Sequence, residues 1–106
     1  MDNAQEFMDS AEDNIKKNRH NAAVSDYFKA IVIYCDYIIY SDRKSLPKNH
    51  SDRFEILEKY YPEIYSIVSK LFRKYTDSYN LKSTKTDVSL MRENAIKVQG
   101  IAKNKK

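Results

Sequence analysis

The segment RKYTDSYN, residues 73–80, carries an arginine, an acid and a tyrosine at spacings that suit one side of a helix. Asp77 follows Arg73 by four residues and Tyr79 follows it by six. A guanidinium group binds phosphate oxygens through paired donors, and a carboxylate or phenol can exchange a proton if its pKa lies near the working pH. Arg73, Tyr79 and Asp77 are therefore the candidate catalytic residues of this chain.

Each of these residues also has a purely structural explanation. Arg73 and Asp77 can form an ion pair along the helix, which is worth only a few tenths of a kcal/mol. Tyr79 can close the edge of a helical bundle. The unperturbed pKa of tyrosine is about 10 and that of aspartate about 3.9, so neither is a general base near neutral pH without a large shift. We therefore expect a helix end that can bind an anion and that does not cleave RNA.

Basic and aromatic residues gather around the same helix end. Only Asp77 offsets the bases between residues 70 and 85, and Tyr75 and Tyr79 are interleaved with them. Such a mixture can hold a phosphate backbone and stack nucleobases, although a solvated basic helix end is the favoured explanation. His50 would join the site if its loop folds toward Arg73. The predicted nucleotide- or phosphate-binding residues are Lys70, Arg73, Lys74, Tyr79 and His50.

Composition indicates one domain, over residues 1–106, with its own apolar core. Apolar residues make up 42% of the chain and charged residues 32%. The single cysteine, Cys35, excludes an internal disulfide, and one cysteine with two histidines does not make a usual zinc site. No glycine-rich phosphate loop is present, so we predict neither a metal nor another cofactor. The net charge of +4 permits nucleic-acid binding without requiring it.

The N-terminal segment and the cysteine usage predict a cytoplasmic protein. The first thirteen residues are acidic and amphipathic, unlike a signal or transit peptide. The longest apolar run, residues 31–40, is interrupted by Asp36 and is too short to span a membrane. We therefore expect no membrane partner.

Scarce chain breakers predict an all-α protein, since there is one glycine, there are two prolines, and no strand-like alternation is present. The first two helices are expected at about 3–18 and 22–43, the second capped by Asn21. A third helix follows the loop at 45–51, capped by Asn49 or Ser51. The last helix, 86–102, follows a loop at 81–86 in which Thr84 and Asp87 resemble a capping box, and residues 103–106 are expected to fray.

The third helix has an apolar face that continues past a proline. Pro62 removes a backbone donor and disfavours helical geometry before it. The helix is therefore either kinked at residues 60–61 or split, and we favour a kink or a tight break. The predicted fold is an up-and-down antiparallel four-helix bundle, or five helices if the third is split. The second helix should be the most buried, and the predicted core includes Tyr34, Ile38, Leu57, Ile64, Val68, Leu71 and Met91.

Three segments together resemble the HEPN superfamily of small prokaryotic helical bundles, in particular the HEPN domains associated with nucleotidyltransferases. AAVSDYFKAIVIYCDYIIY resembles the family's alanine- and aromatic-rich second helix. KNHSDRFEIL resembles its short His-Ser segment, and LFRKYTDSYN with KTDVSLMRENAIKV resembles its arginine-to-tyrosine helix end and final helix.

The resemblance implies a function and a division within the family. Members that are ribonucleases carry an arginine and a histidine with four to six residues between them, and they need no metal. Arg73 matches that arginine, whereas Ser78, Tyr79 and Asn80 stand where the histidine would be. In relatives that pair with a nucleotidyltransferase, a tyrosine near this motif can be the modified residue, and Tyr79 is similar in position.

The function expected from this resemblance is a non-catalytic, homodimeric interaction module for a separately encoded nucleotidyltransferase, in a toxin–antitoxin-like pairing. Two alternatives remain open: a metal-independent ribonuclease of a degenerate type, and a protein that binds RNA or nucleotide through the basic cluster.

Overall fold

The computed structural model describes residues 2–105, with side chains from residue 3 onward, and it consists of helices joined by short connections. The five helices are α1 (Asp2–Lys16), α2 (His20–Arg43), α3 (His50–Tyr60), α4 (Pro62–Asp77) and α5 (Lys85–Lys103). No strand is present within residues 2–105. The predicted all-α class is therefore confirmed, in its five-helix form.

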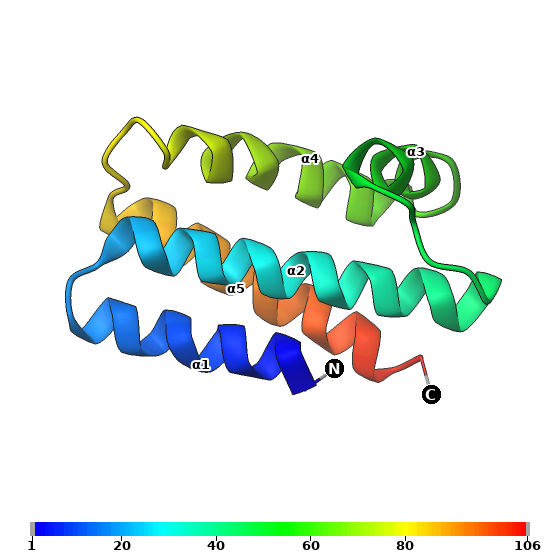
Figure 1. Cartoon of the computed structure of the whole chain (residues 1–106), viewed down its shortest axis with the longest axis horizontal. Coiled ribbons are helices and arrows are strands. Elements are labelled where there is room, and N and C mark those ends of the chain that lie inside the picture. The colour runs from blue at the N-terminus through cyan, green and yellow to red at the C-terminus, as the bar shows by residue number, and fades with distance from the viewer. Residues whose placement is uncertain (1, 106) are drawn as a thin grey trace.

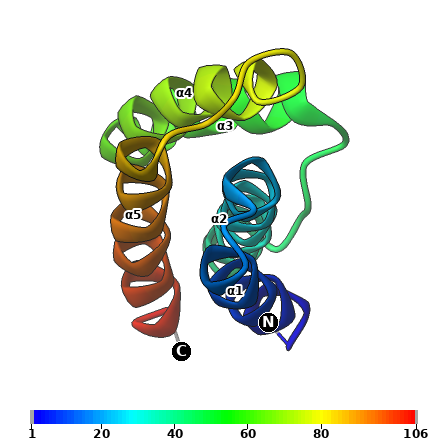
Figure 2. The same ribbon diagram turned by 90° about the vertical axis from the view of Figure 1, so that its left-hand side faces the viewer.

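The four longer helices alternate in direction along the chain, as expected for an up-and-down bundle (Figure 1). The second helix, α2, lies at the centre and contacts α1, α4 and α5. Seen along the bundle, α3 and α4 lie across the top, with α5 below them on one side and α1 and α2 on the other (Figure 2). This arrangement places the candidate residues of α3 and α4 in one upper layer.

The predicted third helix is split into α3 and α4 at a single residue. Tyr61 has φ −138° and ψ 61°, and Pro62 occupies the first turn of α4. Proline is well tolerated there, because the first N–H groups of a helix have no partner within the helix. The chain turns sharply at this point, so that α3 is seen nearly end-on where α4 lies lengthwise (Figure 1).

The core matches the predicted apolar faces. Tyr34, Ile38, Leu57, Ile64, Val68, Leu71 and Met91 are all buried. The second helix contributes ten buried residues, more than any other helix. Cys35 is among them, and its burial raises the pKa of the thiol to about 12, so that it remains a neutral core side chain.

Helix caps confirm two predictions and correct a third. The Asn49 side chain accepts from the Asp52 N–H, and Thr84 with Asp87 forms the capping box of α5. Asn21, in contrast, is not a cap, because α2 begins at His20. Its side chain instead donates to the carbonyls of Ser78 and Leu81 and accepts from the Ser83 N–H at 2.6 Å. It therefore holds the α4–α5 connection against the start of α2.

The C-terminal segment is anchored to the end of α2. Lys103 lies within α5, and Lys105 Nζ is 3.0 Å from Asp42 Oδ2. Tyr61 also donates to Asp42, at 2.6 Å. Residue 106, the last of the segment predicted to fray, lies outside the described residues.

Leu71→Ala should lower the free energy of unfolding by roughly 2–5 kcal/mol, because Leu71 is 1% exposed and its truncation leaves a cavity in a packed core. The matched control is Leu46→Ala, at a side chain that is 61% exposed. Urea unfolding followed by circular dichroism measures both. Equal stability of the two variants would contradict the burial of the α4 apolar face.

Candidate functional site

Arg73 lies exposed on the outer side of α4, where its guanidinium has no ion pair or side-chain hydrogen bond within residues 3–105. Asp77 is also exposed, and the helical ion pair that its spacing permits is not formed. Lys70 is exposed on the same helix, three residues before Arg73. Because residues three apart are neighbours on a helix, Lys70 and Arg73 form a pair of accessible cations.

Lys74 is held by a carboxylate from the next helix. Its Nζ is 2.9 Å from Asp87 Oδ1, while the other Asp87 oxygen accepts from the Thr84 N–H. That backbone N–H, with Lys74 as a further cause, lowers the pKa of the Asp87 carboxyl. Lys74 and Lys82 line a hollow of about 220 Å³ together with Asp77 and Asp87, so the charges there balance. The accessible positive charge of the cluster is thus smaller than the sequence suggests.

Tyr79 is 67% exposed but is held by an aromatic neighbour. Its hydroxyl oxygen is 2.7 Å from that of Tyr75, and the two ring centroids are 5.3 Å apart. Tyr75 in turn stacks on Phe28 at 4.6 Å. The shared hydrogen bond, with partial burial, raises the pKa of Tyr75. Tyr79 therefore presents an accessible hydroxyl from a fixed position.

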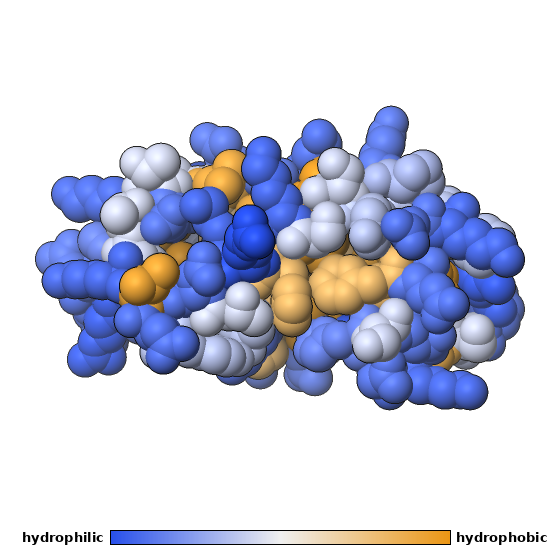
Figure 3. Space-filling view, turned by 90° about the horizontal axis from the view of Figure 1, so that it is seen from above, coloured by the Kyte–Doolittle hydropathy of each residue, from blue (hydrophilic) through white to orange (hydrophobic). Residues whose placement is uncertain are grey.

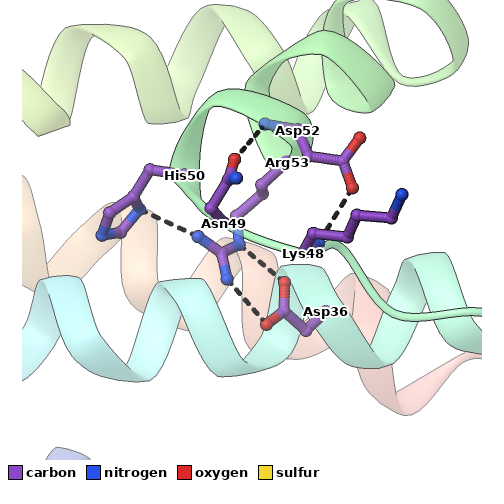
Figure 4. Close-up of polar contacts among 6 residues, drawn as sticks. All are labelled: Asp36, Lys48, Asn49, His50, Asp52 and Arg53. Carbon is purple, nitrogen blue, oxygen red and sulfur yellow. Dashed lines mark hydrogen bonds and ion pairs between the residues drawn. The ribbon is translucent and has the colours of Figure 1, made fainter.

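His50 belongs to a second polar cluster, at the start of α3 (Figure 4). Arg53 Nε is 2.6 Å from Asp36 Oδ1, and Arg53 Nη2 is 2.9 Å from Asp36 Oδ2. Arg53 Nη1 lies 2.8 Å from His50 Nδ1. A guanidinium has only donors, so His50 Nδ1 must accept and the imidazole is neutral, with its hydrogen on Nε2.

Local sequence explains how this cluster is positioned. Asn49 caps α3 and fixes where the helix begins. His50 and Arg53 are then three residues apart on one face of α3, which brings the imidazole to the guanidinium. Arg53 is only 8% exposed, and the two-point contact with Asp36 compensates its charge. The ion pair therefore fastens the start of α3 to α2.

His50 and Arg73 remain in separate clusters. No hydrogen bond or ion pair within residues 3–105 joins His50 to Lys70, Arg73, Lys74 or Tyr79. The connection that does exist is aromatic: the His50 ring centroid is 5.8 Å from that of Phe72, and Phe72 is 6.3 Å from Tyr75. The predicted residues thus lie along one layer without forming a single polar site.

Asp36 and Arg53 were missed as site residues by the analysis of the sequence alone. One signal was available, since Asp36 interrupts an otherwise apolar run in the most buried helix. A buried charge is costly unless it is paired, so an acid in that position predicts a basic partner. The sequence does not say which of its many lysines and arginines provides it.

None of the helices within the described residues is long and apolar enough to cross a membrane. No family model, curated protein or solved structure matches this chain.

Asp36→Ala should lower the free energy of unfolding by roughly 2–4 kcal/mol, because it leaves the buried Arg53 guanidinium without its carboxylate. Asp13→Ala, at an exposed aspartate of α1, is the matched control and should change stability by less than about 0.5 kcal/mol. Chemical denaturation gives both values. Adding Arg53→Met to Asp36→Ala should recover stability, since it removes the stranded charge, and a further loss would contradict this assignment.

Proposed function

We propose that this protein is a non-catalytic HEPN-like interaction module, which forms a homodimer and serves a nucleotide-handling partner such as a nucleotidyltransferase. The resemblance of its helical segments and the five-helix arrangement support this assignment. The observation that carries the non-catalytic part is the contact between His50, the histidine that packs on Phe72 of α4, and Arg53.

A general base needs a free lone pair within reach of the proton that it removes. The lone pair of neutral His50 is on Nδ1, and Arg53 occupies it at 2.8 Å. His20, the other histidine, begins α2 and has no hydrogen bond with Arg73. Arg73 can therefore stabilise a negative charge, but it lacks the partner that would activate a ribose hydroxyl.

The face that α3 and α4 form supports self-association. Viewed from above, apolar side chains gather in the middle of this face, among polar ones (Figure 3). An aromatic row follows the same layer: Phe54 contacts Tyr65 and Phe72, and Phe72 contacts Tyr75. All four rings are only partly buried. Aromatic side chains are enriched at protein interfaces, and a two-fold contact would bury this row against its own copy.

A second candidate function is binding of RNA or nucleotide without cleavage. The observation in its favour is that Lys70 and Arg73 are accessible, with the exposed Tyr79 hydroxyl near the same helix end. Bases beside aromatic rings can bind phosphates and stack nucleobases. Such binding is compatible with the module, because the nucleotide-handling partner would act at the same surface.

Purified protein should leave single-stranded RNA intact in the presence of a chelator. Any weak RNA binding should decrease as salt rises, because it would depend on phosphate contacts. Gel analysis of RNA incubated with wild type, Arg73→Ala and Tyr79→Phe measures cleavage. Specific cleavage by wild type that is lost in Arg73→Ala would overturn the non-catalytic assignment and favour the ribonuclease alternative.

The proposed interaction module is tested by measuring whether the protein forms a dimer and binds a partner protein. Sedimentation at micromolar concentration should show a dimer, and Phe72→Asp should shift it toward monomer, because a charge in the aromatic row would be buried at the interface. Lys97→Asp, on the exposed side of α5, is the control. Purification from native cells should retain a nucleotidyltransferase. A clean monomer that retains no such protein would contradict the proposal.

A further inference from the structure

A pocket of about 480 Å³ lies between α1, α2 and the start of α3, away from Lys70, Arg73 and Lys74. Its volume falls within the range of small-molecule sites, which are mostly apolar with a few placed polar groups. The apolar walls come from α1, α2 and α4, and their residues are Phe7, Phe28, Val32, Ile33 and Tyr75. The rings of Phe28 and Tyr75 are stacked 12° from parallel with their centroids 4.6 Å apart, so the buried Phe28 holds Tyr75 in a fixed orientation at the opening.

The polar residues of the pocket are all basic or neutral. They are Lys29, Asn49, His50 and Arg53, and no carboxylate is among the lining residues. Asp36 neutralises Arg53, and Asn49 is used as the cap of α3. Lys29 is different, because it is exposed and has no ion pair within residues 3–105. Its Nζ lies 5.6 Å from the Phe7 ring centroid, at the edge of an apolar wall.

His50 provides the pocket with a hydrogen-bond donor in addition to the Lys29 ammonium group. Because Arg53 occupies Nδ1, the hydrogen of the neutral imidazole is on Nε2, and the ring lines the same pocket. The pocket thus combines aromatic walls, one uncompensated positive charge and a neutral N–H donor. A planar ring fits the walls, and an anionic group fits the charge.

We propose that this pocket binds a small planar aromatic compound that carries a carboxylate, with Lys29 pairing the carboxylate and the ring lying against the partly exposed Phe7 and Tyr75. This site goes beyond the proposed partner function: it shares Tyr75 with the aromatic row, whereas Lys70, Arg73 and Lys74 are not among its lining residues. The same chemistry is also present in a free aromatic acid and in the C-terminal aromatic residue of a peptide, so the experiment must distinguish these two sources.

The test uses two probes of nearly equal shape, indole-3-acetate and the uncharged indole-3-acetamide. Titration of isotope-labelled full-length protein by NMR should show shifts at the pocket residues, with a Kd for indole-3-acetate of roughly 0.1–1 mM. The amide should bind about tenfold more weakly, which corresponds to one charge-assisted contact. A tripeptide ending in phenylalanine that binds more tightly than indole-3-acetate would identify a chain terminus as the source.

The matched variants are Lys29→Gln and Lys17→Gln, which remove a positive charge from two exposed lysines, inside and outside the pocket. Lys29→Gln should abolish the tenfold preference for the carboxylate, and Lys17→Gln should retain it. Val32→Trp should fill the pocket and remove binding of both probes, with circular dichroism to confirm the fold. The proposal would be overturned if wild type bound the acid and the amide equally, or if the NMR shifts were confined to α4 outside the pocket. It would also be overturned if Lys29→Gln converted a dimer to a monomer, because a second copy would then cover this face.

Discussion

The burial of α2 is the constraint on which the rest of the structure depends. Ten of its residues are buried, on faces too wide for a single neighbouring helix to cover. The chain meets this requirement by packing α1, α4 and α5 around α2, in alternating directions and with short connections. The part of α2 that faces α3 includes Lys29, Val32 and Ile33, which are residues of the candidate pocket.

One acid within this apolar helix determines how α3 is attached. Asp36 pairs with Arg53, and Arg53 Nη1 donates a hydrogen bond to His50 Nδ1. A structural ion pair therefore also sets the chemical state of an imidazole. In this contact His50 Nδ1 faces a group that has only donors, so the ring hydrogen on Nε2 is the one left for another partner. The Arg53 guanidinium thus both attaches α3 to α2 and contacts the His50 ring. It can be nearly buried because the Asp36 carboxylate compensates its charge.

The upper layer of α3 and α4 separates two kinds of surface. Along its aromatic row, partly buried rings from Phe54 to Tyr75 support each other and suit contact with another protein. Beside the row, Lys70 and Arg73 are accessible cations, whereas Lys74 is withdrawn by Asp87. Arg73 has no ion pair within the described residues, so it is suited to binding an anion, as the proposed module for a nucleotide-handling partner would require.

Local features were predictable from the sequence, because they depend on residues within a turn or two of each other. Apolar periodicity predicted the core from Tyr34 to Met91, and short polar side chains predicted the caps at Asn49 and Thr84. Proline chemistry predicted a disruption at Pro62, and the continuous apolar face favoured a kink or a tight break there. The sharp corner at Tyr61 was decided by the packing of α3 on α4.

Only the tertiary structure decided which distant side chains meet. Asp36 and Arg53 are 17 residues apart, Lys74 and Asp87 are 13 apart, and Asn21 reaches Ser83 across 62. Each of these partners has several equivalent alternatives in a chain with 19 lysines and arginines and 15 acids. A charge does not encode its partner, because pairing depends on the distance and burial that helix packing creates. The sequence by itself therefore determined the helices and their buried faces, whereas packing determined that, among the described residues, Arg73 has no ion pair and His50 contacts Arg53.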